Sequence, residues 1–263
     1  LVAIVGAPII ILAIYQDHHA WLWGLIFAAS LLAMWEFFAM SLDDARDRWA
    51  SLVCGAAAAA AFYWLRGRGG EMLALFAAIV PTALYYLFRF GDMTSVANRL
   101  TASVAGILYG GILFAFLALL KRDAGGDFVV LVLAVAWVGD TGAYFAGRFL
   151  GKTKLYPAVS PGKTWAGAFG GLAASVATAV VFKLTRIDYL SWADVILLSA
   201  PAAALGQLGD LVESMIKRSR GVKDSGSILP GHGGILDRID AVLFIAPYTY
   251  LYLVFAPQLR ALF

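Results

Sequence analysis

Long apolar runs separated by short polar segments dominate this sequence. The hydrocarbon core of a bilayer, about 30 Å thick, is crossed by a helix of about 20 mainly apolar residues. We expect such helices at roughly residues 1–15, 20–41, 49–65, 72–88, 100–120, 128–150, 166–184, 194–216 and 239–256. The sequence therefore predicts an all-α polytopic membrane protein with about nine transmembrane helices.

The composition supports this fold class. Of the 263 residues, 62% are hydrophobic and 14% are charged. Soluble domains contain about 45–50% apolar and about 25% charged residues. A water-soluble fold could not cover this much apolar surface, so we expect the excess to face lipid.

A few residue counts exclude other classes of protein. A single cysteine, Cys54, rules out a disulfide framework and a thiolate metal cluster. Two of the three histidines, His18 and His19, are adjacent, which argues against a zinc site. The net charge of +3 is too small to indicate nucleic acid as a partner. The chain starts at Leu1 and not at Met, and we expect a trimmed N-terminus rather than a cleavable signal.

We expect one integral membrane unit in two parts. Residues 1–127 would hold the N-terminal transmembrane helices, and residues 128–263 the catalytic helices with a long loop at 217–238. Of the 20 Lys and Arg residues, most fall in the even-numbered loops, so these loops are predicted to be cytoplasmic and the C-terminus external. Phosphate binding in those loops would be a second cause of the same bias.

Two segments depart from a lipid-compatible pattern. Asp140 stands inside the sixth predicted span, where an acid costs at least about 2.5–3.5 kcal/mol, so it should face a water-filled cavity or a partner on a neighbouring helix. Residues 160–164, Ser-Pro-Gly-Lys-Thr, end like a P-loop, but Pro157 occupies the position of its first glycine and we expect no preceding strand. Lys163 could bind a phosphate or extend to lipid headgroups.

A third segment carries the strongest signal. Four polar residues at the end of the eighth span share one helix face by their spacing: Asp210, Glu213, Ser214 and Lys217. The ninth span opens with Asp237 and Asp240, again on one face. Two helices therefore offer carboxylates at the same membrane depth, joined by a basic, glycine-rich loop.

This arrangement suits phosphoryl chemistry with a divalent metal. Carboxylate and phosphate oxygens form the ligand shell that Mg²⁺ prefers, and Lys and Arg neutralise the remaining phosphate charge. Glycines allow backbone N–H groups to approach an anion. The alternative is an ordinary basic loop whose arginines pair with the acids, which would not explain carboxylates on two adjoining helix ends.

Residues 214–240, hereafter the signature segment, resemble the signature of the phosphatidate cytidylyltransferase (CDP-diacylglycerol synthase) family. Every fixed position of that signature is present: Ser214, Lys217, Arg218, Lys223, Asp224, His232, Gly233, Gly234, Asp237, Arg238 and Asp240. Residues 139–144 and 160–164 also resemble family elements, in the expected order. The resemblance is strong over about residues 130–250, and the first five spans share only the family's general character.

The resemblance implies that CTP and phosphatidate react to CDP-diacylglycerol and pyrophosphate at a bacterial inner membrane, with the active site on the cytoplasmic side. It implies a homodimer, a Mg²⁺ centre at Asp210 and Asp237, and a second, monovalent cation such as K⁺. Asp140 and Glu213 are further candidate metal ligands.

The remaining site residues are assigned to substrate phosphates. Lys217, Arg218, Lys223 and Arg238 would act in catalysis, and the binding set would be Ser160, Lys163, Thr164, Ser214, His232, Gly233 and Gly234. His232 is expected to be structural or a hydrogen-bond donor, because the attacking lipid phosphate is already anionic and needs no general base. Catalysis would then rest on positioning and electrostatics.

Other functions share parts of this pattern. A CDP-archaeol-type synthase or a CTP-using lipid kinase would have the same kind of site, and labelled CTP would separate them from the favoured reaction. An ion-coupled transporter could relay cations through Asp140 and Asp210. A transporter, however, has no need of a basic, glycine-rich loop.

The orientation can be tested by cysteine labelling in a Cys54→Ala background. A cysteine introduced at Ser225 should react only from the cytoplasmic side, and one at Leu262 only from outside. A membrane-impermeant maleimide applied to intact cells distinguishes the two. External labelling at position 225 would reverse the topology and remove access to cytoplasmic CTP.

Overall fold

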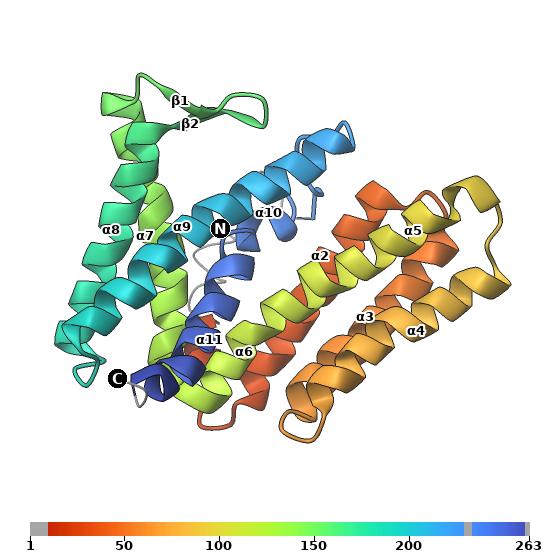
Figure 1. Ribbon diagram of the computed structural model, residues 1–263, viewed down its shortest axis with the longest axis horizontal. Helices are drawn as coiled ribbons and strands as arrows, with labels where there is room; N and C mark the ends of the chain where they lie inside the picture. Colours follow the sequence, from red (N-terminus) through yellow and green to blue (C-terminus); the bar gives the residue numbers. More distant parts are fainter. Residues whose placement is uncertain (1–9, 229–232, 261–263) are drawn as a thin grey trace. The chain divides into compact units, whose positions relative to one another are not determined.

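The structure is a computed structural model that describes residues 10–228 and 233–260 (Figure 1). Residues 10–15 are helical. The elements that follow are α2 (Ala20–Ser41), α3 (Ala45–Trp64), α4 (Gly70–Phe88), α5 (Met93–Gly106), the π-helix η1 (Ile107–Ile112), α6 (Leu113–Ala124), α7 (Gly126–Leu150), β1 (Lys154–Tyr156), β2 (Ser160–Thr164), α8 (Trp165–Thr185), α9 (Trp192–Ser219), α10 (Leu236–Ile239) and α11 (Val242–Arg260).

The helices lie where the apolar runs predicted them. Among the described residues, six helices are long and apolar enough to cross a membrane: α2, α4, the continuous helix Met93–Ala124, α7, α8 and α9. Charged residues open α3, and the apolar part of α11, Val242–Ala256, is shorter than the others. The chain is therefore a multi-pass membrane protein, while the predicted number of nine spans is not confirmed. Residues 1–9 of the first predicted span lie outside the described residues.

Local polar contacts set the helix starts. The Asp44 side chain accepts a hydrogen bond from the backbone N–H of Arg46 at the start of α3. Asp92 accepts from the N–H groups of Thr94 and Ser95 at the start of α5. Such caps satisfy amide groups that have no partner inside the helix, which fixes where each helix begins.

The chain divides into two compact units, which are described separately. The first contains residues 1–119 and 219–239, and the second contains residues 120–218 and 240–263. In this division, the segment 219–239 groups with the N-terminal helices. Hydrogen bonds from this segment to α2, described below, account for that grouping.

In the first unit, α3 packs along α4 (Figure 1), and both α2 and η1 contact α3. Small residues make the close approach possible. A Cβ atom on Gly55 would lie 2.5 Å from the sulfur of Met34, and one on Gly110 would lie 3.1 Å from the Met34 backbone nitrogen. The π-helical turn η1 therefore packs directly on the middle of α2.

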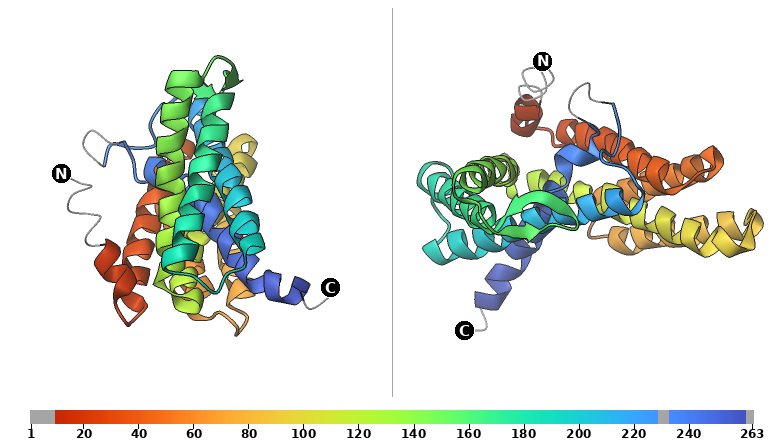
Figure 2. Two further views of the ribbon diagram at one scale, coloured as in Figure 1. Left: turned by 90° about the vertical axis from the view of Figure 1, so that its left-hand side faces the viewer. Right: turned by 90° about the horizontal axis from the view of Figure 1, so that it is seen from above.

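In the second unit, α7 and α8 run side by side and are joined by a two-stranded antiparallel hairpin (Figures 1 and 2). Lys154 pairs with Thr164, and Tyr156 with Ser160. The other elements of the described residues are helices, in agreement with the all-α fold class, but this hairpin differs from the loop without a preceding strand that was expected at residues 160–164. Strands this short carry no apolar alternation, so their pairing leaves no periodic signal in the sequence.

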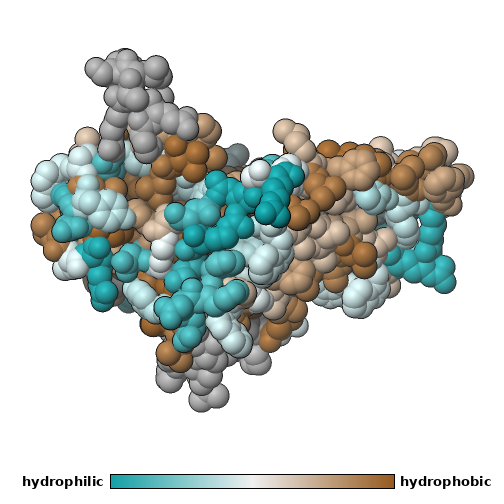
Figure 3. Space-filling view, turned by 90° about the horizontal axis from the view of Figure 1, so that it is seen from below, coloured by the Kyte–Doolittle hydropathy of each residue, from teal (hydrophilic) through white to brown (hydrophobic). Residues whose placement is uncertain are grey.

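Many large apolar side chains remain exposed on the membrane helices. They include Phe76 and Leu87 on α4, Phe149 on α7 and Phe169 on α8. Figure 3 shows broad hydrophobic areas on the face that it draws, interrupted by hydrophilic patches. Exposed apolar surface of this extent is typical of helices that face lipid.

Candidate active site

A cavity of about 500 Å³ in the second unit collects polar residues of three segments that the sequence marked separately. Asp140 lines it from α7, Lys163 and Thr164 from β2, and Asp210 from α9. The cavity is also lined by Arg148. The fold therefore brings Asp140, the 160–164 segment and the start of the acidic face of α9 to one place.

Lys163 is held between two groups of α9. Its Nζ lies 2.7 Å from Oδ2 of Asp210 and donates a hydrogen bond to the carbonyl of Gln207 at 3.3 Å. The side chains of Lys163 and Asp210 keep 24% and 34% of their surface exposed, so the pair remains accessible from the cavity. Lys163 thus points to α9 beside the cavity, and its role in phosphate binding stays a prediction. Thr164 Oγ1 accepts from the N–H of Gly167 and caps α8.

Glu213 and Lys217 occupy a different part of α9. Both are buried, and Lys217 Nζ lies 2.5 Å from Oε2 of Glu213. Within the described part of the chain, neither residue lines the 500 Å³ cavity. The shared helix face is confirmed by α9, whereas the roles of Glu213 as a metal ligand and Lys217 as a catalytic cation stay predictions. Ser214 Oγ donates to Oδ1 of Asp210 over 3.4 Å, a long contact.

Asp240 lies in the turn between α10 and α11, outside the membrane-spanning helices. Burial and the nearby carboxylate of Asp210, together with that of Asp140, raise the pKa of Asp240 to about 7. Gly209 allows α9 to approach the turn that carries Asp240, because a Cβ atom on Gly209 would lie only 2.7 Å from the carbonyl oxygen of Asp240. Three carboxylates therefore gather their negative charge around one place in the second unit.

This concentration of carboxylate oxygens fits a hard divalent cation. Among the residues that the structure describes, no group of three or more His, Cys, Asp or Glu side chains forms a complete metal-binding cluster. A cation would therefore need oxygen ligands from substrate phosphates or water in addition. Mg²⁺ has this preference, since it commonly binds through one or two carboxylates together with phosphates and water.

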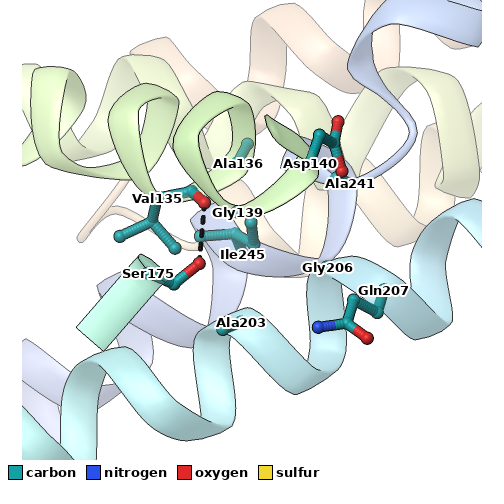
Figure 4. Close-up of a pocket in the computed structure, with 10 residues that line it drawn as sticks. All are labelled: Val135, Ala136, Gly139, Asp140, Ser175, Ala203, Gly206, Gln207, Ala241 and Ile245. Carbon is teal, nitrogen blue, oxygen red and sulfur yellow. Dashed lines mark hydrogen bonds between the residues drawn. The ribbon is translucent and has the colours of Figure 1, made fainter. Parts of the chain in front are cut away.

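Figure 4 shows the residues that line a second, much smaller cavity of about 10 Å³ in the second unit. Asp140 and Gln207 line both cavities. At its other side, Ser175 Oγ donates to the carbonyl of Val135 at 2.9 Å and ties α8 to α7. Gln207 Nε2 donates to the Ala168 carbonyl at 3.0 Å and ties α9 to α8. The helices that carry Asp140 and Asp210 are thus held by polar contacts at membrane depth.

Asp237 belongs to the first unit, where it accepts backbone hydrogen bonds in the first turn of α10. Its Oδ2 lies 3.1 Å from the N–H nitrogen of Ser225 and 2.8 Å from that of Gly234. Gly233 adopts a φ of +75°, in the left-handed region that favours glycine. Because Asp237 and Asp210 lie in different units, a metal shared between them stays a proposal.

The other residues of the signature segment have simpler positions. Arg218, Lys223 and Arg238 are exposed, and their assignment to substrate phosphates stays a prediction. His232 lies outside the described residues. Ser225 is only 5% exposed, so the exposed Ser227 is the better position for the topological cysteine.

Sequence analysis overlooked Glu36, a buried acid in α2. Its carboxylate accepts hydrogen bonds from Ser225 Oγ at 3.0 Å, from the N–H of Ile235 at 2.9 Å and from the N–H of Leu236 at 2.8 Å. The criterion that marked Asp140, an acid within an apolar span, would also have found Glu36.

The raised pKa of Asp240 predicts the pH dependence of stability. Its folded-state pKa of about 7 lies above the ordinary value of 3.8, so the ionised side chain destabilises the fold, by at most about 4 kcal/mol. This cost is absent below about pH 4, grows as the pH rises from about 4 to 7, and stays constant at higher pH. Asp240→Asn should therefore raise the Tm of metal-free protein by a few degrees at pH 8 and leave it unchanged at pH 4.

Thermal denaturation in detergent across this pH range measures the effect. Asp188→Asn, at an exposed position in the connection between α8 and α9, is the control and should show no such trend. Equal Tm values for Asp240→Asn and the parent at pH 8 would contradict the assigned charge cluster.

Comparison with known proteins identifies the family. The profile of the cytidylyltransferase family matches residues 1–256. Phosphatidate cytidylyltransferase of Bacillus subtilis is 42% identical over 152 residues, 57% of this chain and 56% of its own. The protein of the same name from Staphylococcus epidermidis is 44% identical over 133 residues (51% of each chain), and that from Brucella suis is 44% identical over 150 residues (56% and 55%). This chain thus spans about half the length of the curated relatives it matches. As the signature segment predicted, the chain belongs to the cytidylyltransferase family.

Proposed function

We propose that this protein transfers the cytidylyl group of CTP to phosphatidate and releases CDP-diacylglycerol and pyrophosphate. The observation that carries the proposal is the 500 Å³ cavity in which Lys163 pairs with Asp210 beside Asp140. A cation and several carboxylates around an accessible space suit a polyphosphate accompanied by a metal ion. The relatives from Bacillus and Brucella, which bear the name of this activity, support the same reaction.

The reaction needs little acid–base chemistry from the protein. An anionic oxygen of the phosphatidate phosphate attacks the α-phosphorus of CTP and forms a new P–O bond. The bond from the α-phosphorus to the bridging oxygen breaks, and pyrophosphate leaves with that electron pair. The barrier lies in bringing two polyanions together, so the contribution of the protein is positioning and charge neutralisation. Lys163 and Arg148, which line the cavity, are placed to supply positive charge.

Mg²⁺ is the proposed cofactor, with Asp210 and Asp237 as ligands and Asp140 as a further candidate. When bound, it would neutralise negative charge on the triphosphate. Burial and, next to it, repulsion by the carboxylates of Asp210 and Asp140 raise the pKa of Asp240, and this concentration of negative charge supports a site that takes a cation. A second, monovalent cation such as K⁺ belongs to the same proposal.

We further propose a homodimer in a bacterial inner membrane, with the active site on the cytoplasmic side. The acyl chains of phosphatidate would then stay in the bilayer while its phosphate enters the cavity. The excess of Lys and Arg in the even-numbered loops and the exposed apolar side chains of the helices support this placement.

Purified protein with phosphatidate and labelled CTP tests the reaction. Label from the α-phosphate should appear in the lipid, and label from the γ-phosphate should appear in pyrophosphate. γ-Phosphate label in the lipid would instead identify a lipid kinase. Incorporation only into archaeal-type ether lipids would identify a CDP-archaeol-type synthase, and no incorporation with either label would remove the proposal.

The metal dependence gives the first prediction for this reaction. Activity should be lost in EDTA and restored by Mg²⁺. Ca²⁺ should substitute poorly, because its larger and looser coordination shell would misplace the phosphates. CDP-lipid formation is the measurement, and full turnover in chelator would exclude the metal role.

The carboxylates of the proposed metal site give the second prediction for this reaction. Asp237→Asn keeps the size of the side chain and removes its charge. If that charge supports the transition state by about 3–4 kcal/mol, turnover should fall by roughly 10²–10³. Asp210→Asn should have a similar effect, and the double variant should be little worse than either single one, because groups that act as a unit are not additive.

Folding should survive these changes, since removing a charge at a membrane boundary lowers the cost of insertion. Gel filtration of each purified variant checks this. Asp188→Asn, in the exposed α8–α9 connection, again serves as the control with normal turnover. Near-normal activity of a well-folded Asp237→Asn protein would mean that Asp237 has a structural role only.

A further inference from the structure

Glu36 is a buried acid in a helix that is otherwise apolar enough to cross a membrane. It lies in the last third of α2 and is only 2% exposed. A buried carboxylate is destabilising unless hydrogen bonds or a charge compensate it. An apolar side chain of similar size would pack at this position at a lower cost. Packing alone therefore does not explain why a glutamate occupies it.

Three donors from the signature segment provide that compensation. Oε1 accepts from the N–H of Ile235, while Oε2 accepts from the N–H of Leu236 and from Ser225 Oγ. The donors come from two stretches of the signature segment that are ten residues apart in the sequence. One carboxylate on a rigid helix therefore holds both stretches in place.

The backbone of the segment is shaped to this carboxylate. A Cβ atom on Gly226 would lie 2.7 Å from Oε1 of Glu36. A Cβ atom on Gly234 would collide with both Ser225 Oγ and Oε2 of Glu36. A side chain at position 226 or 234 would push the Glu36 carboxylate aside. The hydrogen bonds between Glu36 and the signature segment would then break. The glycines expected to approach a substrate phosphate thus also approach an anion of the protein itself.

The same stretches hold Asp237. Ser225 donates its N–H to Asp237 and its hydroxyl to Glu36. Gly234 donates to Asp237, and the next residue, Ile235, donates to Glu36. The two carboxylates therefore share one small set of donors, and the direction of the Asp237 carboxylate depends on groups that Glu36 holds.

We propose that Glu36 is a positioning residue that orients Asp237 for the transfer by holding Ser225 and the first turn of α10. The proposal rests on the proposed function for the role of Asp237. Glu36 itself would touch neither substrate nor metal. Its effect would reach the reaction only through the geometry of the segment 225–237.

Glu36→Gln is the central variant, because it keeps the shape and replaces one acceptor oxygen with an NH₂ donor. In either orientation of the amide, its NH₂ group faces a backbone N–H, that of Ile235 or that of Leu236. At least one hydrogen bond between residue 36 and the first turn of α10 should therefore be lost. Amide exchange in the segment 233–240 should become at least about 10-fold faster. Turnover should fall by about 10–100-fold, the range for residues that orient metal ligands, with the KM for CTP changed much less and more Mg²⁺ needed for half-maximal rate.

Glu36→Asp, which keeps the charge but is one methylene shorter, should recover part of the turnover and of the Mg²⁺ response. Glu71→Gln makes the same chemical change at a half-exposed position of α4 and should behave like the parent. Ser225→Ala removes one donor with little change in volume. Its defect should be smaller, and Glu36→Gln combined with Ser225→Ala should be no worse than Glu36→Gln alone.

Hydrogen exchange separates this proposal from the proposed function, because it requires no turnover. If the parent protein makes no CDP-lipid, the proposed function fails, while faster exchange in Glu36→Gln still supports the contact with the segment. Unchanged exchange, or full turnover with an unchanged Mg²⁺ response, would overturn the role of Glu36. If Glu36→Gln does not fold, Ser225→Ala becomes the test of the proposal. Unchanged amide exchange and unchanged turnover in Ser225→Ala would then overturn the positioning role of Glu36.

Discussion

Charged groups at membrane depth have no bulk water to solvate them, and this constraint shapes both units of the protein. Several acids among the described residues are paired with hydrogen-bond donors or with a cation. Asp210 has Lys163, Glu213 has Lys217, and Glu36 has three donors of the signature segment. Because the unpaired alternatives would cost several kcal/mol, these pairings fix the positions of the segments that carry them.

Glycine serves this constraint in two ways. Between α7 and α8 it allows close helix packing: a Cβ atom on Gly142 would lie 2.5 Å from the Cβ of Ala174. In the signature segment, Gly226 lets a polar backbone approach a carboxylate. In the first case the gain is van der Waals contact between helices, and in the second it is the satisfaction of a buried charge.

The carboxylates differ in what their surroundings leave them able to do. Glu213 is enclosed with its lysine, whereas Asp210 is one-third exposed and lines a cavity of about 500 Å³. Burial, together with the nearby carboxylates of Asp210 and Asp140, raises the pKa of Asp240 to about 7. An accessible carboxylate can bind a cation, and the cation in turn can bind a phosphate, whereas a carboxylate enclosed with a lysine is reached by neither.

The sequence alone determined the membrane helices, their approximate ends, the family and the residues of the signature segment, because hydropathy, capping residues and fixed polar positions are local features of a chain. It could not show that residues 160–164 form a strand, that Lys163 meets Asp210, that Glu213 and Lys217 are buried together, or that Glu36 holds a segment nearly 200 residues away. Those contacts join residues far apart or depend on which face of a helix is covered. Only the tertiary structure decides them, since a charge on a helix face has the same sequence pattern whether the fold later surrounds it with donors, with a cation or with a cavity.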